Sequence, residues 1–233
     1  MPPSNTVTDK FTSLDESLRH LVMIAAAIAG SNEVITRHVM EKAVGTVDPA
    51  AVDEVILQSY LFAGFPRTLN AARSWRSISG VPAPASDSSA EQKNGGLWQR
   101  LGEETCEIVY GESYQLLREN VKKLHPALDA WMITDGYGKV LSRPQLGLRE
   151  RELCIVAACA ATGQQRQLHS HLHGALNSGV PKEMLSAAID SLGSLIGEAE
   201  LARCRSLLAR VVSKRHPPAV AGARSQIEKG MDG

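Results

Sequence analysis

The chain has 233 residues, with 25 acidic and 25 basic side chains, so it lacks the basic field expected of a nucleic-acid-binding surface. Hydrophobic residues make up 43% of the sequence but aromatic residues only 4%. Because strands are enriched in β-branched and aromatic residues, this composition favours closely packed helices. The longest apolar runs reach about half of the roughly 20 residues that span a bilayer.

Helical signals follow one another from the N-terminus, and no segment alternates well enough to predict a strand. Residues 1–13 are expected to form a flexible arm. Asp15 is placed to cap a helix that ends near Gly30, and Asp48 precedes a proline at a first helical position. The helices predicted in this half of the chain cover 15–30, 33–44, 49–62 and 67–78.

A stretch rich in proline, serine and glycine, residues 80–96, predicts a mobile linker and a domain boundary. Beyond it, a turn is expected at 135–138 and a flexible tail at 214–233. The predicted fold class is all-α. The helices predicted in the second half cover 107–124, 126–134, 148–163, 165–178, 182–195 and a last segment ending near 213.

An internal repeat accompanies these helices. The apolar run 21–29 matches the run 153–161 at an offset of 132, and an offset of 133 then pairs several residues. The pairs are Gly30 with Gly163, His38 with His171, Val47 with Val180, and Gly64 with Gly197. This register predicts a tandem duplication, with a degenerate first module at 14–79 and a second module at 97–213.

The second module contains the best candidates for chemistry. Glu152 opens an apolar run, and His171 lies in a histidine-rich segment after a glycine break, so two joined helices would bring the two side chains together. His171 and Glu152 are the predicted catalytic acid/base pair. Arg166 is suited to hold a carboxylate, and Gln164 and Gln167 are suited to donate hydrogen bonds to an anionic intermediate, so these three are predicted to bind substrate.

Each of these residues also has a structural interpretation. Glu152 is suited to form an ion pair or cap a helix, Arg166 to be a solvated or interface charge, and His171 to be a buried core histidine. His169 and His173 are four residues apart on one helix face and would suit two metal ligands, but no third ligand is evident. We therefore expect no metal and no cofactor.

The N-terminus lacks a charged region followed by an apolar core, so we expect no signal peptide and a cytoplasmic location. No membrane association is expected. The cysteines are then expected to be reduced. Cys154 and Cys159 lie five residues apart, which differs from the spacing of a redox pair, and we interpret them as small buried hydrophobic residues.

Three segments together resemble the carboxymuconolactone decarboxylase family, which also includes alkylhydroperoxidase D-like proteins. They are Arg151-Glu-Leu, the segment from His171 to Val180 with Ala175 and Gly179, and the segment 60–71. The resemblance covers 97–213 well and 14–78 more loosely. It implies a small all-helical bundle that assembles into trimers or hexamers, so a tandem chain would form a homotrimer that is a pseudo-hexamer of modules.

The chain departs from both functional patterns of that family. The resemblance places the two cysteines of the peroxidase members at Gln164 and Gln167, so thiol-based peroxide reduction is chemically impossible at that site. Decarboxylase-like members have a glutamate at the position of Gln167. Glu152 and His171 match the glutamate and histidine of the family.

These observations predict a cofactor-free enzyme that decarboxylates or isomerises a small lactone or oxo-acid. In this hypothesis the first module forms part of the wall of the site and the second module supplies the chemistry. The alternative is a non-catalytic member that binds a ligand or supports assembly. A thiol peroxidase that uses Cys154 or Cys159 is a distant third.

Overall fold

The computed structural model describes residues 14–215, and within that range the chain is helical with no strand, as predicted. The predicted arm and most of the predicted tail lie outside the described residues. The main helices are α1 (Glu16–Gly30), α2 (Glu33–Glu41), α3 (Pro49–Ser79), α4 (Gly95–Tyr110), α5 (Tyr114–Leu124), α6 (Pro126–Trp131), a π-helix (Met132–Leu141), α7 (Leu148–Ala161), α8 (Gln165–Asn177), α9 (Lys182–Ser191) and α10 (Glu198–Lys214).

The helices of the first half begin at the residues that the sequence indicates. Asp15 caps α1 by accepting a hydrogen bond from the backbone N–H of Leu18 at 2.7 Å. Asp48 accepts from Ala50 N at 3.0 Å, and Pro49 occupies the first turn of α3, where its missing N–H costs nothing. These two predictions are confirmed.

Helix α3 is kinked at Gly64, where the sequence predicts a break. Gly64 has φ 76° and ψ 162°, a conformation that L-residues rarely adopt, and Pro66 follows it. The kink separates two straight arms of α3. Arg67, just beyond it, donates hydrogen bonds to the carbonyls of Ile28 and Ser31 and so satisfies the C-terminal end of α1.

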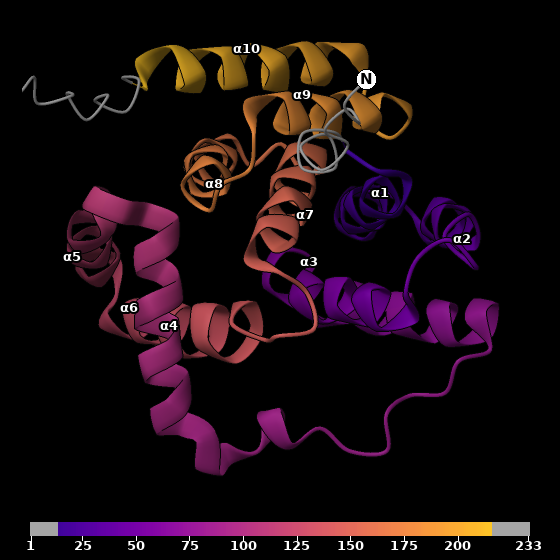
Figure 1. Ribbon diagram of the computed structural model, residues 1–233, viewed down its shortest axis with the longest axis horizontal. Coiled ribbons are helices and arrows are strands. Elements are labelled where there is room, and N and C mark those ends of the chain that lie inside the picture. The colour runs from indigo at the N-terminus through magenta and orange to yellow at the C-terminus, as the bar shows by residue number, and fades with distance from the viewer. Residues whose placement is uncertain (1–13, 216–233) are drawn as a thin grey trace, which may run out of the picture.

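Helix α7 lies at the centre of the molecule (Figure 1). It packs against α1 and α3 on one side and α8 on the other, and α9 and α10 cover one end of the bundle. A side chain at Gly30 would lie 2.6 Å from the carbonyl oxygen of Ala161, so the glycine lets α1 and α7 approach closely. One continuous apolar core therefore joins the two predicted modules.

Helix boundaries recur at the offset of the predicted repeat. α1 begins at Glu16 and α7 at Leu148, 132 positions apart, while α3 and α9 begin 133 positions apart. The kink at Gly64 corresponds in the same register to Gly197, which directly precedes α10. The duplication itself stays a prediction.

Two predictions for the middle of the chain are wrong. The helix expected at 107–124 is two helices, because Gly111 takes φ 52° and ends α4. The turn expected at 135–138 is part of the π-helix. Gly102 and Gly138 permit this arrangement, since a side chain at either would collide with the facing backbone where α4 crosses the π-helix. Local turn signals at 135–138 were overridden by this packing.

The predicted linker ends in ordered contacts with the second half. Arg143 forms an ion pair with Asp87 at 2.9 Å, and the indole N–H of Trp98 donates to the carbonyl of Ser89 at 3.1 Å. The last two residues of the range assigned to the linker, Gly95 and Gly96, already belong to α4.

Candidate active site

Glu152 on α7 and His171 on α8 meet inside the bundle. Nδ1 of His171 lies 2.9 Å from Oε2 of Glu152. The side chain of Glu152 has no exposed area, and that of His171 is 8% exposed. The structure thus brings the two predicted catalytic residues into direct hydrogen-bonding contact.

This contact determines how the imidazole can act. A carboxylate only accepts, so the ring donates its Nδ1–H to Glu152, and Nε2 is the nitrogen left for a ligand. Nε2 forms no hydrogen bond with any of the residues from 14 to 215. The carboxylate orients the ring through this bond, as in other carboxylate–histidine pairs.

A glycine one turn beyond His171 permits the close approach of α8 to this pair. An added side chain at Gly174 would lie 2.7 Å from Oε2 of Glu152 and 2.6 Å from Cγ1 of Val109. Asn177 at the end of α8 also donates to the carbonyl of Val109 at 2.8 Å. Helix α8 is therefore held against α4 and α7 with the carboxylate beneath its backbone.

The first half of the chain contributes one aromatic ring that packs against His171. The ring of Phe62 on α3 lies edge-on to the ring of His171, with centroids 5.8 Å apart and planes at 83°. Phe62 lies two residues before the Gly64 kink. The kink region thus places a side chain of the predicted first module against the histidine of the second.

The other oxygen of Glu152 is unusual. Within the described part of the chain, Oε1 is buried and has no hydrogen-bond partner. An unpaired buried polar atom costs about 1–3 kcal/mol, and more when it is charged. Such atoms often mark functional positions.

Two phenols and a thiol feel the charge of the Glu152 carboxylate. Burial raises the pKa of Tyr110 to about 12, although a hydrogen bond from Tyr137 lowers it, and neighbouring groups that include Glu152 add to the rise. Burial also raises the pKa of Tyr137 well above its ordinary value and that of Cys159 to about 12, with Glu152 again contributing. The rings of Tyr110 and Tyr137 lie 6.2 Å apart in an edge-to-face arrangement. Neither tyrosine is among the site residues predicted from the sequence, and no local signal identifies them.

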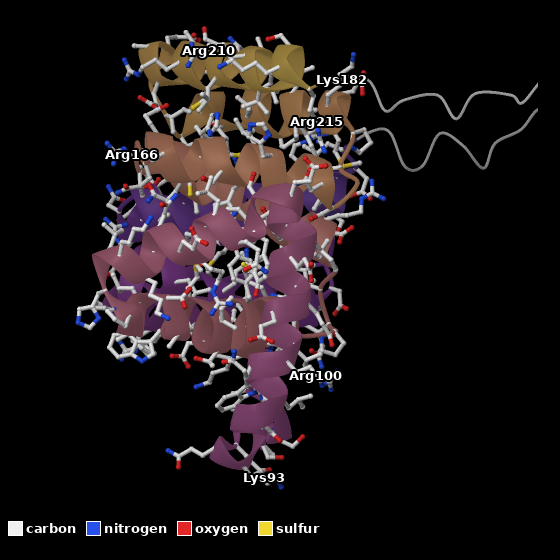
Figure 2. The ribbon with its side chains drawn as sticks, turned by 90° about the vertical axis from the view of Figure 1, so that its left-hand side faces the viewer. Lys93, Arg100, Arg166, Lys182, Arg210 and Arg215 are labelled. Atoms are coloured by element: carbon white, nitrogen blue, oxygen red, sulfur yellow. The ribbon has the colours of Figure 1, made fainter. Side chains whose placement is uncertain are left out.

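The three predicted substrate-binding residues lie apart from this buried cluster. Gln164, Arg166 and Gln167 are exposed at the N-terminal end of α8. Figure 2 shows Arg166 at the edge of the molecule. Gln167 is one helical turn before His171 and shares its face. Gln165, in the same segment, donates to Glu200 at 2.6 Å.

Three hollows at the surface of the described chain are lined by other residues. The first, of about 330 Å³, lies between α1, α2 and α3 beside Arg67. The second, of about 480 Å³, lies between α4 and α5 beside Arg118, and the third, of about 500 Å³, between α9 and α10. Neither Glu152 nor His171 lines any of the three.

A buried ion cluster beside the pair was also missed. Arg151 has no exposed area, and its Nη2 lies 2.7 Å from Oε2 of Glu54 on α3. Arg143 reaches both oxygens of the same carboxylate at 2.8 Å, and Gln58 accepts from Arg151 at 3.2 Å. The only signal in the sequence is a glutamate next to the apolar residues 55 and 56.

Among residues 14–215, the cysteines and the other histidines form no redox pair or metal-binding cluster. Burial raises the pKa of Cys154 to about 12, so its thiol stays protonated at neutral pH. The rings of His169 and His173 lie 4.9 Å apart on α8. Residues 14–215 contain no group of three side chains placed to hold a metal.

Residues 126–209 match the model of the carboxymuconolactone decarboxylase family. This segment is a carboxymuconolactone decarboxylase family domain. It begins at α6, includes both Glu152 and His171, and ends within α10. Helices α1 to α5 lie outside the matched range.

Two curated relatives are similar to a larger part of the chain. Peroxisomal protein 2 of Schizosaccharomyces pombe is 28% identical over 191 residues, which cover 79% of this chain and 88% of the relative. Peroxisomal protein 2 of Saccharomyces cerevisiae is 25% identical over 170 residues, which cover 62% of this chain and 60% of the relative. In residues 14–215, no helix is long and apolar enough to cross a membrane.

Proposed function

We propose that this carboxymuconolactone decarboxylase family protein is a cofactor-free enzyme that decarboxylates or isomerises a small lactone or oxo-acid. The observation that supports this proposal most directly is the buried contact of 2.9 Å between Glu152 and His171. It leaves one ring nitrogen available in an apolar setting, where a general acid or base acts best.

The proposed reaction follows from this geometry. Loss of carbon dioxide breaks a C–C bond and leaves its electron pair on the substrate as a dienolate. The protonated ring of His171 then donates its Nε2 proton to carbon, while Glu152 holds the ring through Nδ1 and stabilises its positive charge. The ring regains its proton from solvent. An isomerisation would use the same nitrogen to remove a proton from one carbon and return it to another.

The site in this proposal is composite. Phe62 of the first half packs against the ring of His171 and forms part of the wall, while the acid/base pair comes from the second half. Gln164, Arg166 and Gln167 lie at the exposed end of α8, so we propose that they meet the substrate at the mouth of the site.

The alternative function is a non-catalytic member of the family. Burial of Glu152 and His171 favours this alternative, as does the position of the three surface hollows away from the pair. A thiol peroxidase is the least favoured proposal. Cys154 and Cys159 are buried, and the pKa of each is raised to about 12 by burial, which leaves little thiolate to attack a peroxide.

Assembly and location belong to the same set of proposals. We propose a homotrimer, which light scattering after size exclusion would measure directly. A cytoplasmic location is the prediction from the sequence, and the names of the two relatives add the peroxisome as a candidate compartment. Fluorescent fusions at either end of the chain, imaged separately, would distinguish the two compartments.

The test is a thermal-shift screen of small lactones, oxo-acids and dicarboxylates, followed by assays of carbon dioxide release. We expect a compound that stabilises the wild type but not His171→Ala, and Glu152→Gln should retain binding with much slower turnover. His38→Ala is the matched control, because His38 is the exposed counterpart of His171 in the predicted repeat. Turnover that survives His171→Ala would contradict the proposal, as would a screen without any ligand.

A further inference from the structure

We propose that Tyr110, whose hydroxyl accepts a hydrogen bond from Tyr137, is the hydrogen-bond donor of the buried site and binds a carbonyl or enolate oxygen of a small acid or lactone beside Glu152. The phenol pair then has the role that the sequence predicts for Gln164 and Gln167. The proposal rests on the proposed function only for the chemical class of the ligand.

The two rings lie together at the end of α4. Tyr110 is the last residue of α4 and Tyr137 lies in the π-helix, and their rings are in edge-to-face contact at 6.2 Å. Val109 precedes Tyr110 in α4. Its side chain and Oε2 of Glu152 both pack against α8 at Gly174. The end of α4 therefore lies directly beside the carboxylate.

The π-helix buries Tyr137. Its wider turn places this residue in the core at 5% exposure, although the sequence around it, with two flanking glycines, has the composition of a surface turn. A π-helix is rare and occurs frequently at functional sites. Here it brings a polar hydroxyl into an apolar interior close to the predicted acid/base pair.

Glu152 has one oxygen left for a ligand. Oε2 is bonded to His171, while Oε1 is fully buried and unpaired among residues 14–215. Oε1 cannot donate, so it and the phenols are complementary: the phenols supply donors, and the carboxylate accepts a proton or a hydroxyl. A ligand with one acceptor oxygen and one acidic C–H or O–H group would match both halves.

The electrostatics fit a donor role. Burial raises the pKa of Tyr110 to about 12, against the lowering effect of the hydrogen bond from Tyr137 and with smaller contributions from neighbouring charges such as Glu152. Burial also raises the pKa of Tyr137 well above its ordinary value. Both hydroxyls thus stay protonated at neutral pH. A neutral phenol can stabilise the negative oxygen of a dienolate without a competing charge.

The exposed end of α8 is a poorer place for this role. Gln164 and Gln167 are accessible to water, where a hydrogen bond to an anion is weak because solvent competes for it. The tyrosines lie in a region of low dielectric, where the same bond is stronger.

The experiment uses the full chain labelled with 3-fluorotyrosine and fluorine NMR. The four tyrosines give four resonances, assigned by single replacements with phenylalanine. The probes are oxalate, levulinate and γ-butyrolactone, which represent an enolate-like dianion, an oxo-acid and a lactone. Tyr114, whose hydroxyl accepts from Arg118 on α5, is the internal control.

We expect Glu152→Gln to move the resonances of Tyr110 and Tyr137 but not that of Tyr114, and at least one probe to do the same in the wild type. If Glu152→Gln leaves both resonances in place, or if no probe moves either of them, the two rings are ordinary core residues and the proposal is overturned.

Kinetics separate this proposal from the proposed function. With any substrate found in the screen, Tyr110→Phe or Tyr137→Phe should lower kcat by about 100-fold with KM nearly unchanged. Turnover that requires His171 but tolerates both replacements would overturn the donor role and leave the proposed function intact. Probe-induced shifts in a protein that turns nothing over would support the donor site and contradict the enzyme.

Discussion

Arg151 and Glu54 form a buried ion pair that connects the two halves of the chain. Nη2 of Arg151 on α7 lies 2.7 Å from Oε2 of Glu54 on α3, 97 positions away in sequence. Arg151 directly precedes Glu152, so this cluster also fixes the turn of α7 that carries the carboxylate of the candidate acid/base pair. Leu146 and Arg143 accept further hydrogen bonds from the same guanidinium through their carbonyls.

Removing Glu54 should be strongly destabilising. Glu54→Ala leaves Arg151 buried without a counter-charge, and breaking such a pair costs about 3–5 kcal/mol. Urea unfolding followed by circular dichroism would measure the loss. The matched control is Glu41→Ala, which breaks an exposed pair with Arg37 and should cost less than about 1 kcal/mol. Equal effects of the two changes would contradict the structural role of the cluster.

The same carboxylate predicts how stability depends on pH. Burial works to raise the pKa of Glu54, but the hydrogen bonds from Arg143 and Arg151 outweigh it and hold the pKa below the ordinary value of 4.5. Because the folded pKa is depressed, the contribution is complete above pH 4.5 and is lost as the pH falls below that value. Unfolding free energies between pH 7 and pH 3 should therefore decline steeply at the acid end. Glu54→Gln should flatten this decline, and an unchanged slope would argue against it.

Gly174 should tolerate no side chain. In Gly174→Ala the new methyl would press on Glu152 and Val109, and overpacking of this kind costs about 1–3 kcal/mol. The displaced carboxylate should also abolish any ligand response that depends on His171. Gly96→Ala is the control, because it is helical and has no atom within 4 Å of the added carbon, so the change should be neutral or stabilising by up to about 1 kcal/mol. Thermal unfolding of both variants decides the matter.

The thiols should be unreactive in the folded protein. All four cysteines are buried, and burial raises the pKa of Cys106, Cys154 and Cys159 to about 12. At pH 8 a thiol reagent should modify the folded protein no faster than the protein unfolds locally. In the unfolded protein the reagent should modify all four thiols. Rapid labelling of the native protein would restore the peroxidase hypothesis.

Phe62 should matter for ligand binding more than Phe65. Phe62→Ala removes the ring that contacts His171, so a ligand found in the screen should stabilise this variant less than the wild type. Phe65→Ala is the control, since that ring is 64% exposed and stacks on Tyr60 instead. Ligand-induced thermal shifts compare the two. Equal responses would show that the first half supplies no wall to the site.

Much of the helical framework could be predicted from the sequence. Caps such as Asp15 and Asp48 and breaks such as Gly64 act over three or four residues, so they are visible in a short window of the chain. The apolar runs in α1 and α7 likewise predict two buried helices. The prediction failed between 107 and 138, where the crossing of α4 with the π-helix at Gly102 and Gly138 determines the local conformation.

For the candidate site, the sequence by itself determined which residues could act as an acid/base pair and that both lie on neighbouring helices joined by a tight turn. Only the tertiary structure decided that the pair is buried, that Phe62 packs against the ring of His171, and that Arg166 lies at the surface. The physical reason is that caps and the hydrogen bonds within a helix are local, whereas burial and electrostatic environment depend on segments up to about a hundred positions away, which meet only when the whole bundle packs.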